Sequence, residues 1–129
     1  MILFSFFSII KSTYFLLKPD ERRIVDELEN KIKDFENFIR NLEECSSALE
    51  LDINYHFSDI IYMENALKGI KIDYLREKHL SDINDRKQKV KTLETRYYKC
   101  KNDLEKFKEE VKNLRRIING IFTSVERSI

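Results

Sequence analysis

A seven-residue repeat of apolar side chains runs through most of this chain and limits what it can fold into. One series begins at Val25, and a second series, out of phase with the first, runs from Ile83 to Val125. Apolar residues alternating three and four apart form a narrow stripe, which one α-helix cannot hide from water by itself. The repeat therefore predicts helices wound around each other, and an ordinary amphipathic core helix is the alternative.

The residues at the a and d positions of the repeat form the predicted interaction seam. They are Val25, Leu28, Ile32, Phe35, Ile39, Leu42 and Leu49 in the first series, and Val90, Leu93, Tyr97, Leu104, Phe107, Val111, Leu114, Ile118 and Ile121 in the second. Because the two series are out of phase, the chain must turn or bulge between about residues 55 and 85. The sequence therefore favours a hairpin of two antiparallel helices.

Charge supports this pairing, because the two halves of the chain have opposite sign. Residues 20–67 hold 13 acidic and 5 basic side chains, whereas residues 68–129 hold 10 acidic and 17 basic ones. At the e positions beside the seam, Glu29, Glu36 and Glu43 can face Arg115, Lys108 and Lys101. The numbers in each pair add to 144, which predicts a tip near Ile72, and registers one heptad either way also pair opposite charges.

Composition agrees with an all-α fold, since the 129 residues include only two Gly and one Pro. We expect an apolar N-terminal segment, 1–18, and a coiled-coil hairpin domain, 19–129, with an arm at 20–56, a tip at 57–76 and a second arm at 77–127. The tip leaves two alternatives open. The segments "DIIYM" (59–63) and "GIKIDY" (69–74) have the composition of strands and predict a small β-hairpin, whereas the heptad positions continue through them and predict helix.

The N-terminal segment also leaves alternatives open. In "MILFSFFSIIKSTYFLL", 11 of the 16 residues after Met1 are apolar, but Lys11 interrupts the run and no basic region precedes it. Sixteen helical residues span about 24 Å, which is shorter than the roughly 30 Å hydrocarbon core of a membrane. We therefore consider a membrane anchor or secretion signal through residues 2–17, a packed or partner-binding segment, and a poorly ordered extension.

The sequence lacks the motifs of catalysis and cofactor binding. It contains no phosphate-binding glycine loop, no GxSxG and no HExxH, so we expect no enzyme activity, no catalytic residues, no metal site and no cofactor. His56 lies at a d position and is expected in the seam, and Cys45 and Cys100 are expected to be buried free thiols. The basic run "RKQKVK" (86–91) could contact phosphates, and Tyr97 and Tyr98 could stack on bases. Tyr97 is expected in the seam, however, and the acidic arm offers the basic charges an internal partner, which disfavours nucleic acid.

The tip and the arms together resemble a prefoldin-type chaperone subunit. The matching segments are "IIYM" before Gly69, "GIKI" after it, and an arginine, Arg86, that opens a second helix running on through "DLEKF" (103–107). The resemblance covers about residues 24–125. The spacer from Tyr62 to Gly69 is longer than in that family, and the segment before Pro19 has no counterpart in it. The resemblance implies a hexameric assembly whose arm ends hold unfolded protein clients.

Two functions therefore compete at the level of sequence. The first is a non-catalytic subunit that docks through apolar helix faces into a hetero-oligomeric complex, or onto other coiled-coil chains or its own copies. Its candidate partner surface consists of Phe38, Phe57, Ile61 and Ile117, which lie outside the seam. The second is the prefoldin-like holdase, and a membrane-anchored tether is a lesser alternative. We expect a cytoplasmic protein unless the N-terminal segment directs it to a membrane or to secretion.

Overall fold

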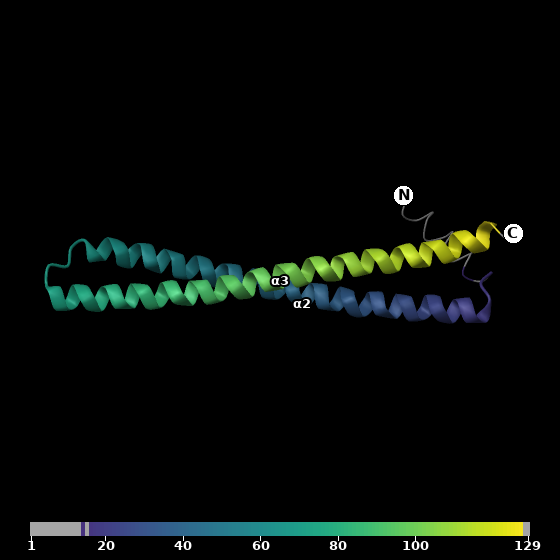
Figure 1. Ribbon diagram of the computed structural model, residues 1–129, viewed down its shortest axis with the longest axis horizontal. Coiled ribbons are helices and arrows are strands. Elements are labelled where there is room, and N and C mark those ends of the chain that lie inside the picture. Colours follow the sequence, from purple (N-terminus) through teal and green to yellow (C-terminus); the bar gives the residue numbers. More distant parts are fainter. Residues whose placement is uncertain (1–13, 15, 128–129) are drawn as a thin grey trace. The chain divides into compact units, whose positions relative to one another are not determined.

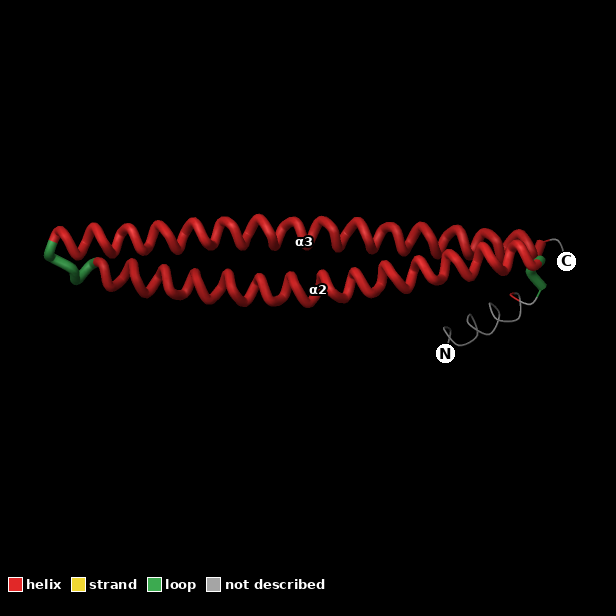
Figure 2. The backbone as a smooth tube through the Cα atoms, turned by 90° about the horizontal axis from the view of Figure 1, so that it is seen from below, coloured by secondary structure: helices red, strands yellow, loops and turns green. Residues whose placement is uncertain are grey.

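The computed structural model describes residues 14 and 16–127, which form two α-helices joined by a short loop. Helix α2 spans Pro19–Leu67 and helix α3 spans Asp73–Arg127. Figures 1 and 2 show the loop, residues 68–72, connecting the end of α2 to the start of α3. The two helices pack against each other, and no strand occurs among the described residues. The predicted all-α helical hairpin is confirmed.

Helix α2 begins where Pro19 and its acidic neighbours predict a helix start. Proline fits the first helical position because its missing N–H has no partner there in any helix. Asp20 and Glu21 lie in the first turn. The Lys18 N–H donates to Glu21 Oε1 at 3.0 Å, so the third helical residue reaches back to cap the residue before the helix.

The loop is closed by backbone hydrogen bonds of the tight i to i+3 type. The N–H groups of Lys68, Gly69 and Ile70 donate to the carbonyl oxygens of Asn65, Ala66 and Leu67 at 3.3, 3.1 and 3.1 Å. These bonds satisfy carbonyls at the end of α2 that would otherwise lack partners. No described residue has a positive φ, Gly69 included.

The small β-hairpin considered for the tip does not form, and that alternative is wrong. The segment "DIIYM" lies inside α2, and "GIKIDY" supplies the loop and the first residues of α3. Ile60 is buried against Ile83 and Val90, with Met63 and Leu67 packed around them. As a helix, this segment keeps its heptad residues on the seam, and that burial outweighs the modest preference of β-branched residues for strands.

The described residues divide into two compact units. The terminal unit contains residues 14, 16–39 and 105–127, and the loop unit is Arg40–Leu104. The terminal unit has the larger core, formed by Leu17, Val25, Ile32, Val111, Ile118, Phe122 and Val125. The loop unit is centred on Ile60, Ile83 and Val90.

Of the predicted N-terminal segment, only residues 14 and 16–18 belong to the described part of the chain. Leu17 is buried in the core of the terminal unit. The Tyr14 hydroxyl donates to the Asp26 carboxylate, with both oxygens at 3.0 Å, and the Arg22 guanidinium lies 5.8 Å from the Tyr14 ring centroid. The end of the segment therefore packs on α2.

Candidate functional site

The predicted interaction seam lies between the two helices in each unit. Of its sixteen residues, none is exposed. Seven are buried, namely Val25, Ile32, Val90, Leu93, Leu104, Val111 and Ile118. The other nine are half-buried: Leu28, Phe35, Ile39, Leu42, Leu49, Tyr97, Phe107, Leu114 and Ile121. The hairpin itself therefore covers most of this stripe and leaves little of it for a partner.

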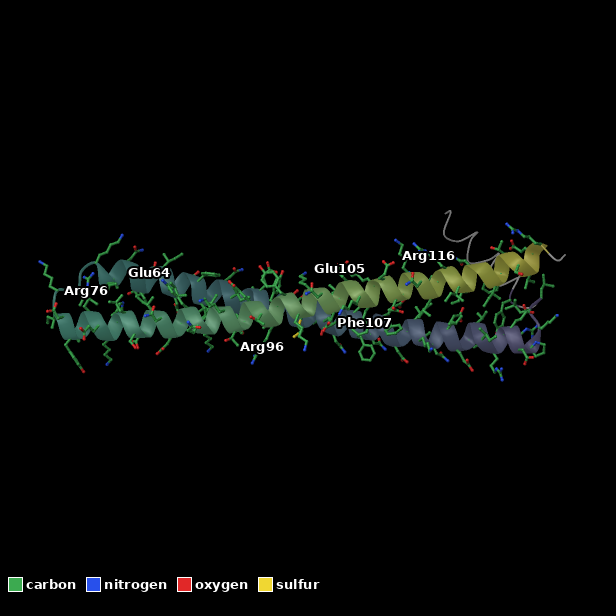
Figure 3. The ribbon with its side chains drawn as sticks, in the orientation of Figure 1. Glu64, Arg76, Arg96, Glu105, Phe107 and Arg116 are labelled. Carbon is green, nitrogen blue, oxygen red and sulfur yellow. The ribbon has the colours of Figure 1, made fainter. Side chains whose placement is uncertain are left out.

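Three phenylalanines from the two helices pack together in the terminal unit. Phe107, labelled in Figure 3, has its ring centroid 5.5 Å from that of Phe35 and 5.6 Å from that of Phe38. These separations are typical of favourable aromatic pairs. Phe38, predicted as part of the partner surface, thus contacts the seam with one ring face while half of its surface remains exposed.

A polar layer interrupts the apolar seam in the loop unit. The Arg86 guanidinium donates through Nη1 to Asp59 Oδ2 at 2.7 Å and to His56 Nδ1 at 3.2 Å. His56 is buried, and because a guanidinium can only donate, its Nδ1 is the acceptor in this contact. Polar layers of this kind fix the register of coiled helices, since a slip would leave a charge without a partner.

A second histidine lies near the loop. His79 Nε2 is 2.9 Å from the Met63 carbonyl oxygen. A carbonyl oxygen only accepts, so Nε2 carries a proton and donates. This bond ties the first turns of α3 to the last turns of α2, and it gives His79 a structural role.

Ion pairs beside the seam follow a register one heptad away from the first prediction. Glu36 Oε1 lies 2.7 Å from Arg115 Nη2, and Glu64 Oε1 lies 3.0 Å from Lys87 Nζ. The residue numbers of both pairs add to 151 in place of 144, so Arg115 pairs with Glu36 and not with Glu29.

The direction of side chains on a helix explains the shift. Every Cα–Cβ bond tilts toward the N-terminus of its own helix. In this hairpin, the side chains of α2 therefore lean away from the loop and those of α3 lean toward it. A pair of long side chains meets when its α3 residue lies farther from the loop than its α2 residue does. The level pair Phe35 and Phe107 adds to 142, whereas the two glutamate pairs at the e positions, with longer side chains, add to 151.

The four residues of the candidate partner surface are all exposed. Phe38 and Ile117 lie in the terminal unit, and Phe57 and Ile61 lie in the loop unit. The heptad pattern places all four outside the seam. Their exposure shows that they remain open in the hairpin.

A larger apolar surface on α2 was missed in the sequence. Leu51, Tyr55 and Tyr62 are 72%, 63% and 75% exposed. They belong to an outer stripe formed by Ala48, Leu51, Tyr55, Ser58, Tyr62 and Asn65, all exposed, uncharged and spaced three or four apart. This spacing is itself a helix-face signal, but it lies on the side of α2 opposite the stronger seam.

Three of the residues considered for nucleic-acid contact, Lys87, Tyr97 and Tyr98, contact other side chains of the loop unit. The Tyr97 and Tyr98 rings meet edge to face at 5.7 Å, and Lys101 Nζ lies 5.6 Å from the Tyr97 ring centroid. Lys87, in the basic run, pairs with Glu64. Of the two tyrosines, only Tyr98 is exposed.

The cysteines differ from the expectation of two buried thiols. Cys45 is exposed and Cys100 is half-buried, and both are free. Cys45 occupies a g position, at the edge of the seam, where the partner helix covers only part of a side chain. Burial, followed by a hydrogen bond with Cys45, raises the pKa of the Cys100 thiol.

The described residues form no metal site and no membrane span, and the chain has no match among known proteins. Within the described part of the chain, no three His, Cys, Asp or Glu side chains gather where they could hold a metal ion. Neither described helix carries an apolar stretch long enough to cross a membrane. No family of known proteins, no curated protein and no solved structure matches this chain.

Proposed function

We propose that this chain is a non-catalytic interaction subunit that docks through the outer stripe of α2 onto a helix of another protein. The single observation that carries the proposal is the exposure of Leu51, Tyr55 and Tyr62 on one uncharged face. The stripe runs about 25 Å along the helix, at about 1.5 Å per residue. An ordered row of exposed large apolar side chains of this kind marks an interaction site more often than scattered ones do.

The charges around the stripe indicate the kind of partner. Residues 41–67 contain six acidic side chains and no Lys or Arg. Arg86 and Lys87 of α3 pair with Asp59 and Glu64. Glu50 and Asp52 flank Leu51 in sequence, so a partner helix with an apolar stripe bordered by Lys and Arg would be complementary to this surface.

Phe57 and Ile61 extend the apolar surface toward one side of the stripe. Both are exposed, and Ile61 precedes Tyr62 directly. Aromatic residues supply large contact areas at interfaces and are enriched among residues that dominate binding energy. The expected centre of the interface is therefore the region around Tyr55, Ile61 and Tyr62.

The proposal can be tested by affinity purification of the tagged full chain from its native cells, with quantitative mass spectrometry. Tyr55→Glu/Tyr62→Glu should lose a specific set of helical proteins, because it places charge at the centre of the interface. Tyr98→Glu is the matched control, since Tyr98 is an exposed tyrosine of α3 outside the stripe. Circular dichroism should show that both variants remain helical.

Two outcomes would contradict this function. One is the same set of captured proteins with both variants. The other is sedimentation of the purified chain as a dimer that the double tyrosine variant converts to a monomer, because the stripe would then serve self-association.

A prefoldin-like holdase is the second candidate, and exposed apolar residues at the loop favour it. Ile72, Tyr74 and Leu75 are all exposed, and they lie at the end of the hairpin where such a chaperone would hold clients. Purified protein should slow the aggregation of a reduced or heated client protein, and Ile72→Ser/Tyr74→Ser/Leu75→Ser should abolish this effect. Equal protection by both forms, or none by either, would rule against the loop as a client site.

A membrane-anchored tether depends on residues 2–17, most of which lie outside the described residues. Leu17 packs in the core of the terminal unit, which favours a packed segment at its end. Alkaline carbonate extraction of membranes distinguishes the two, because an inserted anchor stays in the pellet and a packed segment is released with the protein.

A further inference from the structure

Equivalent pairs along the hairpin place Cys45 opposite Cys100. Asp59 and Arg86, at g and d positions of the loop unit, make a 2.7 Å ion pair. A move of two heptads along each helix, away from the loop, replaces Asp59 by Cys45 and Arg86 by Cys100. The numbers of both pairs add to 145. The pair one heptad farther still, Phe38 and Phe107 in the terminal unit, stacks at 5.6 Å.

The surroundings of the two thiols agree with the positions that this register gives them. A hydrogen bond with Cys45 is among the causes that raise the pKa of Cys100, after burial. Cys45 is exposed, whereas Cys100, on the facing helix, is half-buried. The pair thus combines an accessible thiol with a sheltered one on the facing helix.

We propose that Cys45 and Cys100 form an oxidation site, at which a peroxide converts the two thiols into a disulfide that joins α2 to α3. The Cys45 thiolate attacks one peroxide oxygen and becomes a sulfenic acid, and the leaving hydroxide takes up a proton to form water. The Cys100 thiolate then attacks Cys45 Sγ and displaces the sulfenic hydroxyl, which leaves as a second water. Two thiols and one hydrogen peroxide give one disulfide and two waters.

The consequence is a covalent link between helices that are otherwise held by the seam. Residues 45 and 100 are far apart in sequence, so the link closes a long loop of the unfolded chain and removes much of its entropy. The disulfide should persist in the unfolded chain and keep residues 45 and 100 joined there. This site is independent of the partner-docking function, because neither cysteine belongs to the outer stripe.

The test uses the purified full chain treated with a small excess of hydrogen peroxide. Intact mass should fall by two hydrogen atoms without dimer formation. Digestion with trypsin, which cleaves after Arg40, Lys68, Lys99 and Lys101, should give peptide 41–68 joined to the dipeptide Cys100–Lys101. The midpoint of thermal unfolding should rise by about 10 °C and return to its original value with a reductant.

Two variants test whether the disulfide requires this pair of cysteines. Cys100→Ser should give sulfenic and sulfinic forms of Cys45 with no gain in thermal midpoint. Glu44→Cys/Cys45→Ser moves the thiol by one residue, about 100° around the helix, and should form no internal disulfide. Disulfide-linked dimers in the wild-type chain, or sulfinic acid at Cys45 with Cys100 still reduced, would overturn the proposal.

Discussion

Replacing Leu104 with alanine is the sharpest test of the seam. Leu104 is 4% exposed and lies at an a position of α3. The substitution removes three buried carbon atoms, which costs about 2.4 kcal/mol at about 0.8 kcal/mol each. The cavity left between the helices raises the expected loss to about 3–4 kcal/mol. Leu104→Asp should cost more, because it adds an unpaired charge at the same place.

Urea unfolding followed by circular dichroism measures this effect. With a slope of about 1.5 kcal/mol per molar urea, the Leu104→Ala midpoint should fall by about 2 M. Lys108→Ala, four residues along the same helix at an exposed position, is the matched control. Because surface charges contribute less than about 1 kcal/mol, its midpoint should fall by less than about 0.7 M. Similar shifts for Leu104 and Lys108 would refute the assignment of the seam.

Three further predictions concern polar groups. Arg86→Leu leaves the Asp59 carboxylate without its cation, so in urea titrations it should reduce stability more than the double variant Asp59→Leu/Arg86→Leu does. Equal losses would exclude energetic coupling between Asp59 and Arg86. Glu36→Gln should lower stability by less than about 1 kcal/mol, and the loss should vanish in an Arg115→Gln background or in high salt. Alkylation of Cys100 should require a higher pH in the native chain than in urea, because burial raises its pKa. The native state therefore holds this proton more tightly, and the resulting stabilisation is complete below the ordinary thiol pKa and lost as pH rises through the native one.

Heptad spacing predicted the helices and their pairing because it encodes which side chains must leave water. The sequence alone does not decide the conformation of the tip, for a physical reason. Residues 59–63 have the composition of a strand, but Ile60 and Met63 also keep the helical heptad spacing. The burial of Ile60 against Ile83 and Val90 favours the helix. Local preference alone does not include that contact.

The sequence left the charge register open by one heptad either way, whereas the outer stripe was not predicted. The pairing of Glu29 with Arg115 assumes that side chains extend straight out from each helix. Because they tilt along the helix axis, the partner of Arg115 is Glu36, one heptad away. The spacing of Leu51, Tyr55 and Tyr62 is visible in the sequence, but only the fold shows that all three side chains are exposed on one face of α2.

The loop between the helices has a practical consequence. Its backbone conformations are open to any L-amino acid, and a Cβ added at Gly69 would meet its nearest atom, the Ala66 carbonyl oxygen, at an ordinary 3.7 Å. The reversal of the chain therefore depends on where the two helices stop and start, and not on a glycine. A reporter peptide or fluorescent label inserted after Gly69 would follow the hairpin in living cells while leaving the seam and the outer stripe intact.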